Sequence, residues 1–528
     1  MPSIRTGLIV ARPSPSVRAH NVAATEAGLR AARSPAASFL QSATYPAVRI
    51  LIIGIALLYV CELLVHGMVS AVYPYDLNYA EGYILNDSLR LLRGEAVWAD
   101  ITQFPMVRSP YPPLYLVVVG LLSFGNGSFV AARTISLAAT VAIGLMIAWR
   151  AREIGAPWHG VAASAGLWFG STFVYQWAPL ARVDVLGLAF ALAGVLTLVD
   201  SRSPTWRRIL LSALCCALAL CTKQTLVAAP VAVTLWLALR RDWRALPFAA
   251  LVGGAVGFVT LAFNALSGGQ YVQHVIFGNA ANPFDFGRVA EWAWMFAKLN
   301  VFALALVVVA VGAALVRWRR HRNGVALIWV YAATALATIP SVGNVSSDVN
   351  YLLEPTVALA LLVGWVWREA MLSKVTPHPA ASLGASVLCL AQLVLLVHIP
   401  NGFMSQYPPG PAKGSTPVAE DVRIGAEVEA IVREAAPMAL VEPAGFSVLA
   451  GSPVWIQPID LRSEKALGRW TAETLVDSIR LHRWRVVVLN YKFLPDEVMD
   501  ALEREYRLDR GLASPNGFSY FVYRPGDI

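Results

Sequence analysis

The run ILIIGIALLYVCELLVHGMVS, from Ile50 to Ser70, is the stretch of this sequence that decides the fold class. A helix needs about 20 predominantly apolar residues to cross a bilayer, and this run supplies them without a break. Its only charged residue, Glu62, lies four positions before His66 on the same helix face, where the two can pair. The sequence therefore predicts a membrane-spanning helix at the start of the folded chain.

The same pattern recurs along the chain. Of the 528 residues, 57% are hydrophobic and only 14% are charged, whereas soluble domains carry about 25% charged residues. The net charge of +9 does not indicate a nucleic-acid partner, because the basic residues form short clusters between apolar runs. We predict a mostly α, polytopic membrane bundle of about eleven spans, at residues 49–70, 129–149, 159–178, 183–200, 208–222, 225–240, 245–266, 296–317, 325–341, 350–369 and 381–399.

The basic clusters give the orientation of these spans. They are Arg5 to Arg49, Arg150/Arg152, Arg202/Arg207/Arg208, Arg240/Arg241/Arg244, Arg317 to Arg322 and Arg368/Lys374. The positive-inside rule places all of them in the cytoplasm, with the N-terminus inside and the C-terminus outside. Residues 114–124 are apolar but short, and a full span there would reverse every later cluster. We therefore expect a half-span that continues into the next helix.

The chain divides into three parts. Residues 1–48 resemble a disordered cytoplasmic tail, 49–400 form the membrane module with an outer loop at 71–113, and 401–528 form a small extracytoplasmic α/β domain. In that last part strand-like runs at 438–441, 485–489 and 518–523 alternate with helical patterns at 419–434, 471–483 and 496–505. It contains no glycine-rich nucleotide loop, metal-ligand spacing or nucleophile motif, so we expect a binding or lid domain.

Polar residues suited to chemistry gather on the outer side. The first outer loop reads YPYDLNYAEG at residues 73–82, and apolar residues then recur at helical spacing from Ile84 to Leu92. We expect this amphipathic helix to lie on the membrane surface and to end at Gly94. Each acid of the loop has a structural alternative: Asp76 as a helix N-cap, and Glu81 as a first-turn acid that offsets the helix dipole.

Three further polar groups face the same side. They are Arg182 and Asp184 between two spans, Lys223 and Gln224 in a tight turn, and Asn350, Tyr351 and Glu354 at the start of a later span. Ionisable residues are costly in hydrocarbon and mark functional sites by default. The structural alternatives are a local salt bridge between Arg182 and Asp184, a snorkelling Lys223, and a Glu354 that only faces a water-filled vestibule.

The order of these features resembles the GT-C fold glycosyltransferases. An acidic outer loop after the first span, the run Tyr-Ala-Glu-Gly at 79–82, Leu-Arg-Gly at 92–94 and Tyr-Pro-Pro-Leu at 111–114 are most similar to the branch of glycosyltransferase families 39 and 83. This branch includes the protein O-mannosyltransferases and the lipid A aminoarabinose transferases. Leu77 follows Asp76 where the family commonly has an Asp-Glu pair, which leaves the donor sugar and metal dependence open.

The resemblance implies a sugar donor linked to polyprenyl phosphate and an essential acid in the first outer loop, here Asp76, with Glu81 beside it. The acid would deprotonate the acceptor hydroxyl, and Arg182 and Lys223 would stabilise the phosphate leaving group. Asp184, Gln224, Asn350, Tyr351 and Glu354 would contact substrate. We expect a lipid, glycan or protein acceptor, a location in the cell membrane, and no cofactor, since no metal ligand set is evident.

Two other classes of protein remain open. A lipid or sugar transporter also carries intramembrane acids, but its charges should line a path between both faces, and the two halves of the chain show no convincing repeat. A non-catalytic membrane scaffold with an outer binding domain leaves Lys223 and Glu354 unexplained.

Overall fold

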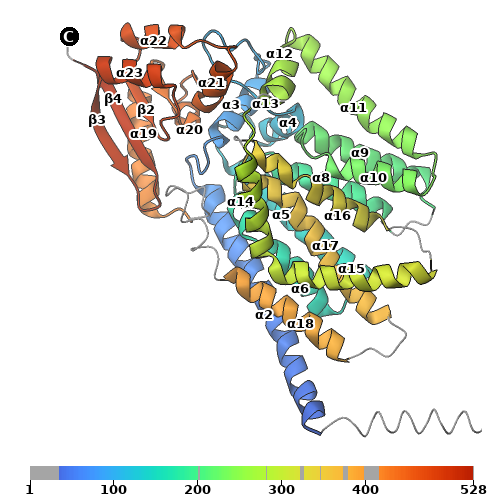
Figure 1. Cartoon of the computed structure of the whole chain (residues 1–528). Helices are drawn as coiled ribbons and strands as arrows, with labels where there is room; N and C mark the ends of the chain where they lie inside the picture. The colour runs from blue at the N-terminus through green and yellow to red at the C-terminus, as the bar shows by residue number, and fades with distance from the viewer. Residues whose placement is uncertain are drawn as a thin grey trace, which may run out of the picture.

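The computed structural model describes residues 35–199, 203–280, 282–321, 326–344, 347–372, 379–397 and 416–526. The described chain is mostly helical. A bundle of apolar helices carries a smaller α/β unit, residues 419–525, at one of its ends (Figure 1). We call this smaller part the C-terminal unit. Most of the predicted tail at 1–48 and the Pro/Gly-rich linker at 407–411 lie outside the described residues.

The bundle consists of long and short helices with apolar sequences, whose side chains are buried against other helices or face lipid. They are α2 (Pro35–Val72), α4 (Pro113–Leu122), α5 (Val130–Glu153), α6 (Trp158–Phe169), α7 (Thr172–Trp177), α8 (Asp184–Leu198), α9 (Trp206–Thr222), α10 (Ala228–Leu239), α11 (Ala245–Leu266), α14 (Phe286–Leu299), α15 (Val301–His321), α16 (Leu327–Ala337), α17 (Leu353–Leu372) and α18 (Pro379–Val397). Their order follows the predicted apolar runs.

Fewer helices are long enough to cross a membrane than the eleven spans that the sequence predicts. Among the described residues four helices are long and apolar enough to cross a membrane, and a fifth span results if α14 and α15, bent by 83°, count as one. Several other predicted spans are apolar helices of only 10–17 residues. The total of eleven therefore stays a prediction. α4 has 10 residues, or about 15 Å, and turns at Phe124 and Gly125 stop it from continuing into α5.

The amphipathic helix of the first loop is present as α3 (Glu81–Leu92). It ends where the sequence predicts, because Gly94 adopts a positive φ of 73° just beyond its C-terminus. Most of α3 is buried: α4 packs on it from the bundle, and α20 (Ala444–Leu449) packs on it from the C-terminal unit. The helix is therefore held between two parts of the protein, not laid open on a surface as the sequence suggests.

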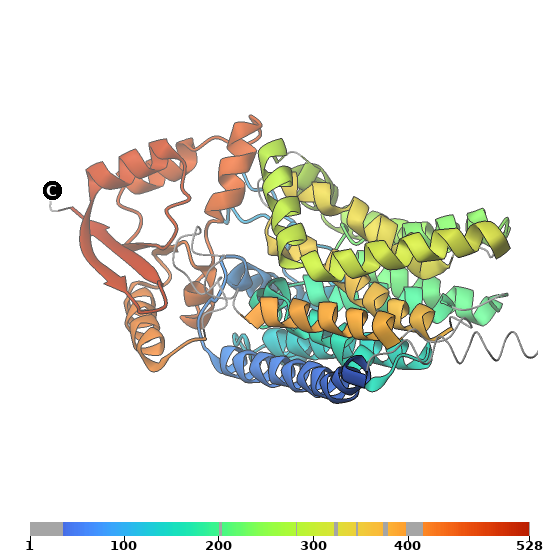
Figure 2. The ribbon, with the colours of Figure 1, turned by 60° about the horizontal axis from the view of Figure 1, so that its bottom comes forward.

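The C-terminal unit is a four-stranded sheet with helices on it (Figure 2). The strands lie in the order β1-β2-β4-β3, and only β1 and β2 are parallel. Their bounds are β1 Ala439–Val441, β2 Val486–Leu489, β3 Tyr506–Ala513 and β4 Ser519–Pro525, with helices α19 (Ala419–Ala435), α21 (Pro458–Ala466), α22 (Glu473–Arg480) and α23 (Asp496–Glu505). The predicted strands coincide with β1, β2 and β4. The sequence pattern did not predict β3, α20 or α21.

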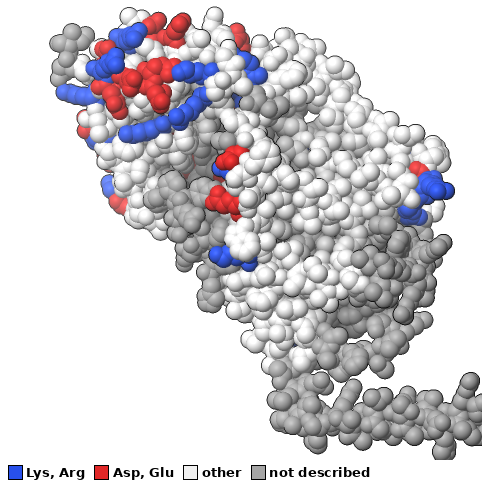
Figure 3. Space-filling view, in the orientation of Figure 1, with Lys and Arg blue, Asp and Glu red and all other residues white. Residues whose placement is uncertain are grey.

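Charge is distributed unevenly over the surface. In Figure 3 the face of the C-terminal unit is crowded with Lys, Arg, Asp and Glu, whereas the described face of the bundle carries few charges, a small group over α14 near the unit and another at its far end. That far end includes the turn between α10 and α11, where Arg240, Arg241 and Arg244 lie. An uncharged belt between two charged ends is what a bilayer requires of a protein that crosses it.

Candidate functional site

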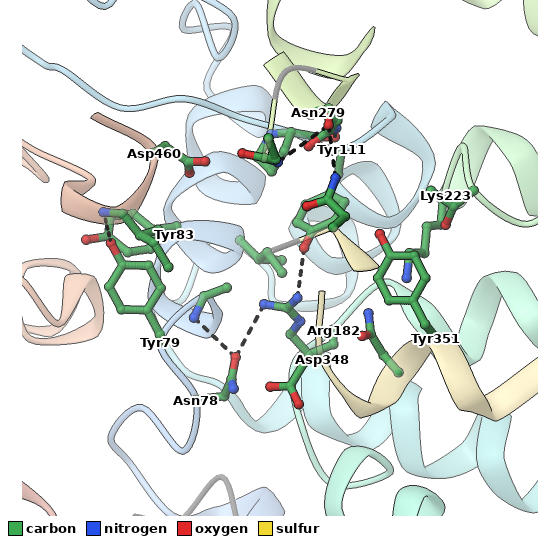
Figure 4. A pocket seen from close by; sticks show the side chains of 18 of the residues that line it. Asn78, Tyr79, Tyr83, Tyr111, Arg182, Lys223, Asn279, Asp348, Tyr351 and Asp460 are labelled. Atoms are coloured by element: carbon green, nitrogen blue, oxygen red, sulfur yellow. Dashed lines mark hydrogen bonds between the residues drawn. The ribbon is translucent and has the colours of Figure 1, made fainter. Parts of the chain in front are cut away.

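A cavity of about 540 Å³ opens where the bundle meets the C-terminal unit (Figure 4). Its walls come from α3 and the loop before it, from Pro110 and Tyr111, from the ends of α7 and α9, from the turns η2 (Ile339–Gly343) and η3 (Val349–Leu352), and from the start of α21. Segments from nearly the whole chain therefore meet here.

Arg182 forms part of one wall. It lies in the short connection between α7 and α8, and its guanidinium donates to Asn78 Oδ1 at 3.3 Å and to the Tyr111 hydroxyl at 2.8 Å. The side chain is buried, yet its Nε has no hydrogen-bond partner in the part of the chain that the structure describes. A buried guanidinium N–H is costly to leave unpaired, so this wall can accept an anionic ligand.

Lys223 lies beside Arg182 on the same wall. Its ammonium donates to Asp184 Oδ1 and lies 4.5 Å from the centre of the Tyr351 ring. Asp184 also accepts from Asn350 Nδ2 at 2.7 Å and from Trp177 Nε1 at 2.8 Å. Lys223, Asn350 and Tyr351 line the cavity, whereas Asp184 does not line it and holds the Lys223 ammonium in place from behind the wall.

The remaining predicted substrate residues differ in position. Gln224 lines the cavity and donates to the carbonyl oxygens of Pro110 at 2.9 Å and Val275 at 3.1 Å. Glu354 is buried in α17 and is not one of the cavity-lining residues. Five of the predicted residues therefore surround one cavity: Arg182, Lys223, Gln224, Asn350 and Tyr351.

The two predicted catalytic acids lie outside the set of residues that line this cavity. Asp76 accepts from the backbone N–H groups of Gly82 at 2.7 Å and Gly445 at 3.0 Å. A Cβ on Gly445 would lie 2.1 Å from Asp76 Oδ2, so only glycine permits this approach of α20 to the loop. Burial, and then the charge of Glu81, raise the pKa of Asp76 to about 7.

Glu81 is fully buried and forms a two-pronged ion pair with Arg133, both N···O distances being 2.9 Å. It also accepts from the backbone N–H groups of Leu77, Asn78 and Ala181. These five bonds use the acceptor capacity of the carboxylate. The structure thus gives Glu81 and Asp76 clear structural functions, and their catalytic roles stay predictions.

The opposite wall carries two acids whose proximity was not predicted from the sequence. Asp87 of α3 and Asp460 of α21 both line the cavity. Arg108 donates to Asp460 Oδ1 at 3.0 Å and to Asn279 Oδ1 at 2.8 Å. Figure 4 shows Asp460 across the cavity from Lys223. Asp87 could be recognised in the sequence as a polar residue of an amphipathic helix, but no sequence signal places Asp460 next to it.

In the described part of the chain, no three His, Cys, Asp or Glu side chains are grouped in a way that could hold a metal ion. The chemically distinctive groups of the cavity are its two cations, its separate acids and its aromatic rings. Tyr79, Tyr83 and Tyr111 are examples of these rings.

This chain is similar to known proteins in sequence and in fold. The model of glycosyltransferase family 87 matches residues 110–342. ArnT from Cupriavidus metallidurans in the apo state superposes with a TM-score of 0.56 at 12% identity, over 89% of this chain and 97% of that one. The same protein bound to undecaprenyl phosphate gives 0.54 at 13% identity, over 89% and 98%. No curated protein matches the sequence significantly.

The structural likeness extends over most of both chains and shows that the fold is the GT-C fold that the sequence resembles. The matching family model covers the connection that carries Arg182 and the turn that carries Lys223. It is family 87 that matches, whereas the sequence motifs suggested families 39 and 83. This chain therefore shares the GT-C fold with ArnT, and its residues 110–342 are similar to glycosyltransferase family 87.

Proposed function

We propose that this protein transfers a sugar from a polyprenyl-phosphate donor to a lipid, glycan or protein acceptor at the extracytoplasmic face of the membrane. One observation carries the proposal: the buried Arg182 and Lys223 lie side by side on one wall of the cavity, and the Arg182 Nε has no hydrogen-bond partner among the described residues. The two cations share Asp184 as a counter-ion. The two cations outnumber this shared counter-ion, which suits a wall that meets a donor phosphate.

A lipid-linked donor suits both the chemistry and the location of this wall. The leaving group of such a donor is a phosphate, and fixed cations stabilise the charge that develops on it. The wall lies at the end of the apolar bundle, where a lipid headgroup would be met. The bound undecaprenyl phosphate in ArnT, which shares this fold, supports the same class of donor.

A direct displacement needs no covalent enzyme intermediate. The acceptor hydroxyl would attack the anomeric carbon, and the bond from that carbon to the phosphate oxygen would break. A carboxylate must take the hydroxyl proton. The resemblance predicts Asp76 for this step, but both of its oxygens accept backbone N–H bonds between α3 and α20. That role stays a prediction.

The proposal can be tested with the purified protein in vesicles. The substrates are undecaprenyl phosphates that carry radiolabelled mannose, glucose or arabinose, and a total membrane extract supplies acceptors. We expect at least one donor to lose its sugar to an acceptor, releasing undecaprenyl phosphate, while the matching nucleotide sugars remain unused. Transfer from a nucleotide sugar alone would contradict a lipid-phosphate donor, and no transfer from any donor would contradict the proposal.

The orientation in the membrane gives a separate prediction. We propose that the N-terminus is cytoplasmic and the C-terminal unit extracytoplasmic, because the basic turn between α10 and α11 lies at the opposite end of the bundle. A membrane-impermeant maleimide on intact cells should label Leu481→Cys, at a position 80% exposed in the C-terminal unit, and should miss Trp243→Cys, at a position 68% exposed in the turn.

The unaltered chain is the control for that labelling, since its five cysteines lie within apolar helices. Labelling of Trp243→Cys but not of Leu481→Cys would reverse the topology and place the cavity on the cytoplasmic side.

A further inference from the structure

Asp87 is buried in the middle of α3, where an aspartate is difficult to explain by structure alone. It is 2% exposed and lies six residues after Glu81, the first residue of the helix, so it caps neither end. Aspartate is a poor helix former away from the N-terminus. In the described part of the chain it forms no ion pair, since Arg90 of the same helix pairs with Glu95 instead. A buried carboxylate without a salt bridge is costly, and such groups gather at functional sites.

Asp87 lines the same cavity as the two cations, and it does so from α3. Tyr83 precedes it by four residues, so the two side chains share one face of α3. Both line the cavity. Figure 4 shows Tyr83 on the side of Asp460, with Lys223 on the other side. If Arg182 and Lys223 hold the donor phosphate, the α3 wall with Tyr83 and Asp87 is the part of this cavity of about 540 Å³ that is left to meet an acceptor.

The other carboxylates at this site are already engaged. Asp184 accepts hydrogen bonds from Lys223, Asn350 and Trp177, which include both of its oxygens. Asp460 is paired with Arg108.

Asp348 accepts from the backbone N–H of Val349 at 2.7 Å, and it lies next to Arg182 on the phosphate side (Figure 4). A base there would be next to the leaving group instead of opposite it. Asp87 is the cavity carboxylate that lies on α3, away from the leaving group, and that forms no ion pair in the described chain.

The surroundings of Asp87 also suit a group that exchanges protons near neutral pH. Burial raises its pKa to about 7, the nearby Asp460 charge raises it further, and the Ser109 hydroxyl, Arg90 and Asn86 oppose that rise. A general base works best when its pKa lies near the pH at which the enzyme operates. Asp87 is ionised above about pH 7 and neutral below it.

We propose that Asp87 is the general base that deprotonates the acceptor hydroxyl, an inference that rests on the transferase function proposed above. As the acceptor oxygen forms its bond to the anomeric carbon, its proton passes to an oxygen of Asp87. The bond from the anomeric carbon to the phosphate oxygen breaks, and the electron pair leaves with polyprenyl phosphate, which Arg182 and Lys223 hold. Asp87 then releases the proton to water.

The test compares Asp87→Asn with the wild type, using the donor and membrane extract that give transfer in the vesicle assay. Removal of a general base lowers the rate by about a hundredfold or more. We expect Asp87→Asn to lose at least that factor in kcat while it binds undecaprenyl phosphate as tightly as the wild type. Asp87→Glu, which keeps a carboxylate, should restore part of the rate. Wild-type turnover should fall as the pH drops through about 7, as the Asp87 carboxylate becomes protonated.

The matched control is Asp100→Asn, an exposed acid of the same loop region, which should transfer at the wild-type rate. Normal transfer by Asp87→Asn, or loss of turnover on Asp76→Asn alone, would overturn this inference and leave the transferase function intact. Loss of undecaprenyl phosphate binding in Asp87→Asn would also overturn it, because the residue would then shape the site instead of moving a proton. Absence of transfer by the wild type would instead refute the proposed function itself.

Discussion

Replacing Arg133 by methionine should prevent this protein from reaching a stable folded state. Arg133 is fully buried near the start of α5, and its guanidinium bonds both oxygens of Glu81 and the carbonyl oxygens of Ser70, Tyr73 and Tyr75. Loss of one partner of a buried ion pair costs about 3–5 kcal/mol, since the other charge is left uncompensated. The total stability of a domain is about 5–15 kcal/mol, so the loss is a large share of it.

The measurement is the yield of monodisperse protein in detergent and its melting temperature. Arg133→Met with Glu81→Gln is the matched control, because the double variant removes both charges while the glutamine oxygen can still accept from backbone N–H groups. We expect the double variant to be more stable than Arg133→Met alone. Equal stability of Arg133→Met and wild type would show that this pair does not hold the loop before α3 on the bundle.

Arg133 also shows which contacts of the first outer loop could be predicted from the sequence and which could not. An arginine in a predicted span, close to its outer end, is a signal of the same kind as Lys223, and it could have been paired with an acid of the first loop. The resemblance to the GT-C glycosyltransferases implies catalytic roles for the acids Asp76 and Glu81. Their actual partners, Gly445 and Arg133, depend on how α20 and α5 approach the loop, which no local pattern specifies.

The fold and the cation wall were more predictable. Apolar runs and turn residues indicate helices directly, since they reflect local periodicity and backbone preference. Lys223 and Arg182 were recognisable because a cation next to an apolar helix is rare. Asp460 was not recognisable in the sequence. α21 reaches the cavity only through the packing of the C-terminal unit, and the sequence of α21 resembles that of any solvated helix. Apolar runs do not fix the length of a helix, and short helices such as α8 and α10 are the reason why the number of complete spans stays a prediction.

Changing either cation of the wall to glutamine should weaken the binding of undecaprenyl phosphate. Each charge-assisted hydrogen bond contributes on the order of 1.5–3 kcal/mol, so about a ten- to hundredfold rise in Kd is expected per site. Lys223→Gln should have the larger effect, because it also leaves the buried Asp184 with only Arg182, 3.8 Å away, as a counter-ion. That uncompensated carboxylate would repel the phosphate. Adding Asp184→Asn to Lys223→Gln should therefore recover part of the lost affinity.

Undecaprenol, which lacks the phosphate, separates the charge effect from a general loss of lipid binding. It should bind the wild type and both variants almost equally. Lys298→Gln removes an exposed cation of α14 that does not line the cavity, and it should leave the Kd for undecaprenyl phosphate unchanged. If both wall variants bound the phosphorylated lipid as the wild type does, the phosphate site would have to lie elsewhere and the observation that carries the proposed function would be lost. Weakened binding together with movement of the intact lipid across vesicles would favour a transporter, since a transferase breaks the bond between sugar and phosphate and a transporter does not.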